Sequence, residues 1–257
     1  SASGLLTAER EECKYGVTTT SGTTALHLAV ASAGLKKGDE IIMPSFTFPS
    51  TANAFLLRGA RPVFVDIRHD TLNIDETLIE AAITPRTKAI VAVHYAGIPC
   101  EMDTIMAIAK KHDLFVIEDA AQAFLSTYKG KSAGTIGHLG TFSFHATKNI
   151  SCGEGGALLV NHSEFLETAE ILREKGTNRK DFLAGKVEKY TWSGIGTSSS
   201  VGELAAAYLC AQLEDAREIT AKRAVHWNAY DAALKGLRTN GDISTPFIPP
   251  TAQHNSH

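Results

Sequence analysis

The chain has 257 residues, of which 44% are hydrophobic and 21% are charged, and its formal net charge is −3. This composition is typical of a globular protein that buries one large core, and it excludes a linker or a disordered tail. The 25 basic and 28 acidic residues are interspersed, so no basic stripe indicates binding to nucleic acid or to an anionic membrane.

The four cysteines, Cys13, Cys100, Cys152 and Cys210, form no Cys-x-x-Cys pair, which argues against a disulfide framework and a zinc site. The histidines show no His-x-x-x-His spacing on a predicted helix, so we predict no metal. No apolar run reaches the roughly 18 residues that span a bilayer, and the first residues do not follow the plan of a signal peptide. We therefore expect a protein of the reducing cytoplasm.

Apolar runs rich in β-formers alternate along the chain with segments of helical periodicity. Strands are predicted at residues 40–43, 62–66, 89–94, 114–119, 140–144 and 156–161, and helices at residues 23–33, 50–58, 75–82, 101–112 and 163–175. This alternation predicts an α/β fold in which helices cover both faces of a mainly parallel sheet. Ligands bind such sheets at the carboxyl ends of the strands, and Asp119 ends one of them.

Residues 176–200 are rich in Gly, Ser, Thr, Lys and Asn, which predicts a long functional loop. Residues 201–237 have the pattern of one long helix or a bent pair of helices. The tail, residues 245–257, contains three prolines and no periodicity.

Lys148 stands between a short apolar strand and the glycine-rich turn Gly-Glu-Gly-Gly at residues 153–156. A lysine whose pKa is lowered by burial or by neighbouring charge can form a Schiff base, most commonly with the aldehyde of pyridoxal phosphate. The pyridine nitrogen of that cofactor needs a carboxylate, which Asp119 can supply. The opening hypothesis is therefore a pyridoxal-phosphate enzyme with Lys148 as its catalytic residue.

The hydroxyl-rich turn at residues 18–24 runs into a predicted helix, and a helix start is a natural phosphate site. Gly22, Thr23 and Thr24 would supply amides and hydroxyls there, and Ser143 a further contact. By itself the turn is more typical of an ordinary helix cap at Ser21 or Thr23 than of a phosphate site.

Two more side chains could contact a pyridoxal ring. Gln122 could bind its phenolic oxygen, and Phe48, between Pro44 and Pro49, could stack on it. Taken singly, a glutamine is more often a surface amide and a phenylalanine a core residue. Glu154, in the glycine turn, is a weaker candidate for a substrate contact.

The order and spacing of four motifs resemble those of the DegT/StrS-type nucleotide-sugar aminotransferases. The motifs are Ser-Gly-Thr-Thr-Ala at 21–25, Pro-Ser-Phe-Thr-Phe at 44–48, Val-Ile-Glu-Asp-Ala-Ala-Gln at 116–122 and Ser-Phe-His-Ala-Thr-Lys-Asn at 143–149. Within that family, stretches such as residues 73–83, 100–106 and 173–179 are most similar to the dTDP-4-amino-4,6-dideoxygalactose transaminases.

The resemblance implies the large domain of an aspartate-aminotransferase-like, fold type I enzyme over residues 1–237. It also implies that residues 238–257 begin a smaller C-terminal domain and that family chains are longer at both ends. The expected reaction passes the amino group of L-glutamate to a dTDP-4-keto-6-deoxyhexose, with 2-oxoglutarate as the other product. The expected assembly is a homodimer with shared active sites.

The resemblance also assigns residues and leaves alternatives open. The family's loop asparagine, which reaches a neighbouring subunit's cofactor phosphate, is Ser198 here, so that contact differs in this chain. A 3-keto-sugar aminotransferase and a cofactor-binding but catalytically idle relative remain as alternatives. A dehydratase of the same fold would have His in place of Lys148.

Overall fold

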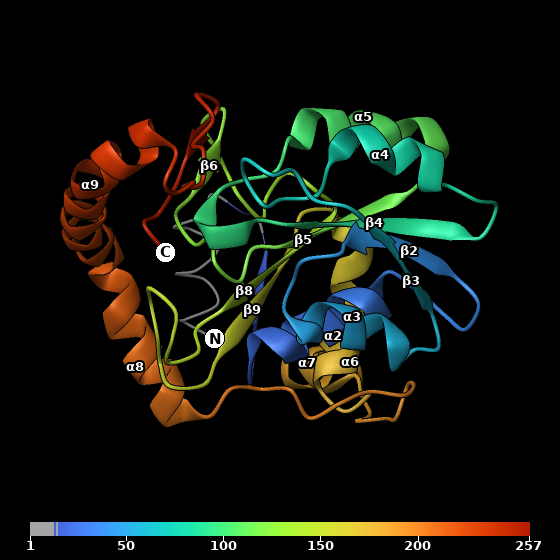
Figure 1. The fold of residues 1–257 in the computed structure, drawn as a ribbon. Coiled ribbons are helices and arrows are strands. Elements are labelled where there is room, and N and C mark those ends of the chain that lie inside the picture. Colours follow the sequence, from blue (N-terminus) through green and yellow to red (C-terminus); the bar gives the residue numbers. More distant parts are fainter. Residues whose placement is uncertain (1–12, 14) are drawn as a thin grey trace.

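A computed structural model describes Cys13 and residues 15–257, and its central feature is a seven-stranded sheet (Figure 1). The strands, in chain order, are β1 (Gly16–Thr19), β2 (Glu40–Pro44), β3 (Arg61–Val65), β4 (Thr87–Val93), β5 (Phe115–Asp119), β8 (Leu139–Ser143) and β9 (Gly156–Val160). Their spatial order is β1-β9-β8-β5-β4-β2-β3. From β8 to β3 each strand pairs in parallel with its neighbour, whereas β9 pairs antiparallel with both β8 and β1. This arrangement confirms the predicted mainly parallel α/β sheet.

Helices cover both faces of this sheet. They are α2 (Gly22–Ser32), α3 (Pro49–Leu56), α4 (Glu76–Ile79), α5 (Met102–His112), α6 (Leu166–Arg173), α7 (Arg179–Leu183), α8 (Glu203–Glu214) and α9 (Ala216–Asn240). Figure 1 shows α4 and α5 on one face and α2, α3 and α6 on the other. Each face has its own buried apolar cluster, so the central strands are buried on both sides and read as continuous apolar runs.

A third apolar cluster lies at the side of the sheet where α8 and α9 run. Leu209 and Leu213 of α8 are fully buried there against Phe142, Phe144 and Leu159. The predicted long or bent helix is a pair of helices that meet at Asp215, whose backbone leaves helical geometry (φ −95°, ψ 5°).

Several elements differ from the sequence prediction. The short edge strand β1 and the helix α7, which lies inside the predicted loop, have too few residues to show a period. A small second sheet joins β6 (Thr127–Tyr128), β7 (Lys131–Ser132) and β10 (Ala252–Gln253), so the aperiodic tail contributes a strand. Residues 1–12 and 14 of the predicted large domain lie outside the described residues.

None of the helices in the described part of the chain is long and apolar enough to cross a membrane. Nor do these residues bring together three His, Cys, Asp or Glu side chains that could hold a metal ion.

The third cluster gives a test of the fold. Phe142 is fully buried and meets Phe124 edge to face, with ring centroids 5.3 Å apart. Phe142→Ala leaves a cavity and should lower the free energy of unfolding by about 3–5 kcal/mol, measured by urea denaturation. Phe64→Ala removes a ring that is 57% exposed and should cost less than about 1 kcal/mol. Equal losses in the two variants would contradict this account of the core.

Candidate active site

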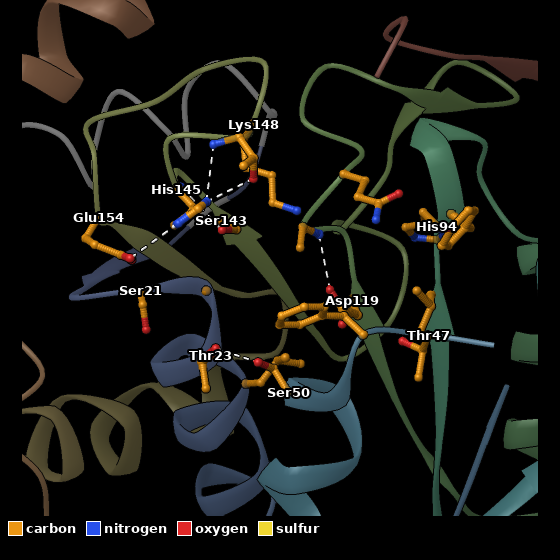
Figure 2. Close-up of a pocket in the computed structure, with 18 residues that line it drawn as sticks. Ser21, Thr23, Thr47, Ser50, His94, Asp119, Ser143, His145, Lys148 and Glu154 are labelled. Atoms are coloured by element: carbon orange, nitrogen blue, oxygen red, sulfur yellow. Dashed lines mark hydrogen bonds and ion pairs between the residues drawn. The ribbon is translucent and has the colours of Figure 1, made fainter. Parts of the chain in front are cut away.

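A cavity of about 440 Å³ opens at the carboxyl ends of the parallel strands. This volume lies within the range of roughly 300–1,000 Å³ that is typical of small-molecule sites. Its walls come from the start of α2 and from the loops after β2, β4, β5 and β8. Figure 2 shows Lys148 and Asp119 in this cavity, with His145 and Glu154 on one side and His94 on the other.

Lys148 lies in the turn that follows β8. Its backbone N–H donates to the carbonyl oxygen of His145 at 2.9 Å, which holds the start of this turn. Burial lowers the pKa of the Lys148 amine from its ordinary value, while the negative charge of Asp119 acts in the opposite direction. The net shift is downward, so Lys148 loses its proton more readily than a surface lysine does.

Asp119 is the last residue of β5 and is only 5% exposed. The hydroxyl of Thr51 donates to its Oδ2 at 2.7 Å, and the backbone N–H of Ala121 donates to its Oδ1 at 3.2 Å. A buried carboxylate is stable when such donors satisfy it. These two bonds fix the carboxylate on the cavity wall.

The first turn of α2 forms the opposite wall. Ser21 is its N-cap, and its Oγ accepts the backbone N–H of Thr24 at 3.1 Å. Gly22 and Thr23 come next, and amides at these positions of a helix have no partner within the helix. They line the cavity and lie at the positive end of the helix dipole, where an anion is stabilised.

Gly22 allows a close approach of this turn to Ser143. A Cβ atom at Gly22 would lie 2.6 Å from the Cβ of Ser143, closer than side chains can come. The hydroxyl of Thr23 is 2.7 Å from that of Ser50. Amides and hydroxyls therefore converge where the sequence predicted a phosphate.

The structure brings together most of the predicted site residues. Those that line the cavity are Gly22, Thr23, Phe48, Asp119, Gln122, Ser143 and Lys148. Glu154, the weaker candidate, also lines it, with its Oε1 3.5 Å from Nε2 of His145.

Two predicted residues lie elsewhere. The hydroxyl of Thr24 lies 2.9 Å from Ser21 Oγ and 3.0 Å from Thr20 Oγ1, so it belongs to the helix cap and not to the cavity wall. Ser198 is on the exposed loop before α8, and its backbone pairs with that of Glu174 in an isolated antiparallel β-bridge. It does not line the cavity.

Gln122 is oriented by a backbone contact. Its Oε1 accepts the N–H of Ala96 at 2.6 Å. With that oxygen engaged, the amide nitrogen is the group left to donate to a ligand oxygen. Phe48 is 69% exposed and lines the cavity.

The sequence reasoning missed His94, which lines the cavity although it is fully buried. Its Nδ1 accepts the backbone N–H of Cys100 at 3.1 Å, so its proton lies on Nε2, 2.8 Å from Glu118 Oε2. Glu118 also accepts backbone N–H groups from Gly134, Ile136 and Gly137. One signal in the sequence could have identified His94. It directly follows β4, at the carboxyl end of a parallel strand, where ligands bind such sheets.

The sequence model of the DegT/DnrJ/EryC1/StrS aminotransferase family matches residues 7–257. The chain is 38% identical over 247 residues to the spore coat polysaccharide biosynthesis protein SpsC of Bacillus subtilis, covering 95% of this chain and 63% of that protein. It is 39% identical over 243 residues to GDP-perosamine synthase of Caulobacter vibrioides, covering 94% of this chain and 62% of that enzyme. The chain thus spans less than two thirds of the length of these relatives.

Solved structures agree with this similarity. An aminotransferase from Psychrobacter cryohalolentis has a TM-score of 0.94 and 34% identity, covering 99% of this chain and 67% of that one. The PLP-form of Spr1654 from Streptococcus pneumoniae has a TM-score of 0.89 and 26% identity, covering 100% of this chain and 68% of that one.

The shifted pKa of Lys148 can be measured by its reactivity. In limited acetylation followed by peptide mass spectrometry, the rate at Lys148 should reach half its plateau at a lower pH than at Lys129. Asp103 and Tyr128 raise the pKa of Lys129, so it is the natural comparison. Asp119→Asn removes the charge that favours the ammonium form and should lower the Lys148 midpoint further. A Lys148 midpoint at or above that of Lys129 would contradict the described environment.

Proposed function

The chain belongs to the DegT/DnrJ/EryC1/StrS aminotransferase family, and from its cavity we propose that it binds pyridoxal phosphate and transfers an amino group to a nucleotide-linked keto sugar. The observation that carries this proposal is the joint placement of three groups in one cavity. These are the Lys148 amine, the buried Asp119 carboxylate and the open amides at the start of α2.

The donor set fits the cofactor at each of its polar ends. Gly22, Thr23 and Ser143 would hold the phosphate, and Asp119 would hold a proton on the ring nitrogen. The amide of Gln122 would donate to the phenolic oxygen, and Phe48 would cover one ring face. Pyridoxal phosphate, when bound, supplies an aldehyde that captures amines and a ring that withdraws electrons from neighbouring bonds.

Lys148 would have two roles in transfer. Its amine is the attachment point for the aldehyde, because burial lowers its pKa and leaves more of it unprotonated. Once an amino donor has displaced it, the free Nζ can take a proton from one carbon and return it to another as general base and acid. The Asp119 carboxylate would hold the proton on the ring nitrogen throughout the transfer.

For substrates we propose L-glutamate as donor and a dTDP-4-keto-6-deoxyhexose as acceptor, which would give the 4-amino-4,6-dideoxyhexose of galacto configuration. Support comes from the local motif similarity described above. Because one relative is a GDP-perosamine synthase, the base of the nucleotide could also be guanine. A 3-keto sugar is the alternative acceptor. We further propose a homodimer, in which the exposed loop that carries Ser198 contacts the partner's site.

Borohydride reduction of the cofactor-loaded protein tests the lysine assignment. We expect the cofactor to be fixed on the peptide that contains Lys148, and Lys148→Ala to be unlabelled and at least about 10³-fold slower in transfer. Lys110→Ala, at an exposed position on α5 away from the cavity, should match the wild type. Label on another lysine would contradict the assignment.

Acceptor choice can be read from isotopically labelled glutamate and a panel of dTDP-, GDP- and UDP-linked 3-keto and 4-keto sugars. The proposal predicts label in the dTDP-4-keto acceptor's product. A protein that is labelled at Lys148 by borohydride but transfers nitrogen to none of these sugars would instead be a catalytically idle binder.

A further inference from the structure

The C-terminal segment, residues 252–257, lies behind the wall of the cavity. It enters through β10, which pairs with β6, and its last residues turn toward the loops that follow β5 and β8 (Figure 1). Asn255 is 1% exposed and Ser256 is 7% exposed. Buried polar side chains form hydrogen bonds, so the partners of these residues show which segments the C-terminal residues contact.

Asn255 bonds to the turn that carries Gln122. Its Nδ2 donates to the carbonyl oxygens of Gln122 and Phe124, both at 2.8 Å. Its Oδ1 accepts the backbone N–H of His257 at 3.2 Å. The turn after β4 also meets this side chain, because a Cβ atom at Gly97 would lie 2.0 Å from Asn255 Oδ1. Only glycine permits that approach.

Asn149 makes the second half of the link. It directly follows Lys148, and its Nδ2 donates to the carbonyl oxygen of Asn255 at 2.8 Å. Its Oδ1 lies 3.1 Å from Nδ1 of His257. Burial, with the positive charges of Lys148 and Arg223, lowers the pKa of His257 to about 4, so the ring is neutral at pH 7 and Nδ1 can donate to Asn149.

We infer that Asn149 and Asn255 are positioning residues that join the Lys148 loop to the turn after Asp119. This inference rests on the proposed function. Three backbone carbonyls, two side-chain amides and one imidazole make the hydrogen bonds that link the segments carrying the amine and the ring contacts. A displacement of about 1 Å between reacting groups can cost roughly 100-fold in rate, so such a path has a direct use in this cavity.

The test compares side-chain deletions along this path. Asn149→Ala and Asn255→Ala should each weaken the affinity for pyridoxal phosphate about tenfold, measured by titration of the visible absorption band. Both should also shift the pH midpoint of that band, because the surroundings of Lys148 change. Gln253→Ala, an exposed position in the same segment, should reproduce the wild-type affinity and midpoint.

Asn149→Ala is the decisive variant, because Asn149 is only partly buried, and circular dichroism of the cofactor-free variant checks that it folds. A lower melting temperature with wild-type affinity and pH midpoint would show a merely structural role and overturn the inference. A wild-type protein that does not bind pyridoxal phosphate would overturn the proposed function, and this inference with it.

Discussion

The site depends on an opposition between burial and charge at Lys148. Burial favours the neutral amine, whereas the carboxylate of Asp119 favours the ammonium form. Charges interact strongly when water is excluded. A small change in the burial of Lys148 or in its distance from Asp119 therefore changes the pKa of the amine. The hydroxyl of Thr51 and the amide of Ala121 limit this effect by fixing the carboxylate.

The sheet order explains how this opposition is built. β4, β5 and β8 are neighbours and run parallel, so the residues that follow them meet at one edge. That edge receives His94, Asp119 and Lys148 from segments far apart in sequence. The antiparallel pairing of β1 with β9 then brings the start of α2, with its open amides, to the same edge.

Much of this arrangement was predictable because it is encoded locally. Strand runs, the helix cap at Ser21 and the strand-terminal Asp119 follow from short patterns, and motif order indicated the family. The contacts that complete the site were not predictable. Thr51 reaches Asp119 across 68 positions and Asn255 reaches the Gln122 carbonyl across 133, and no local pattern marks either residue. Thr24 was predicted to contact a phosphate, but its hydroxyl lies 2.9 Å from Ser21 Oγ and belongs to the helix cap, which the local pattern did not reveal.

A crystal structure of the chain with bound pyridoxal phosphate tests the central claim most directly. The account predicts continuous density between Lys148 Nζ and the cofactor, the ring nitrogen at the Asp119 carboxylate and the phosphate at the amides of Gly22 and Thr23. Density for the cofactor away from Asp119, or attached to another lysine, would contradict it.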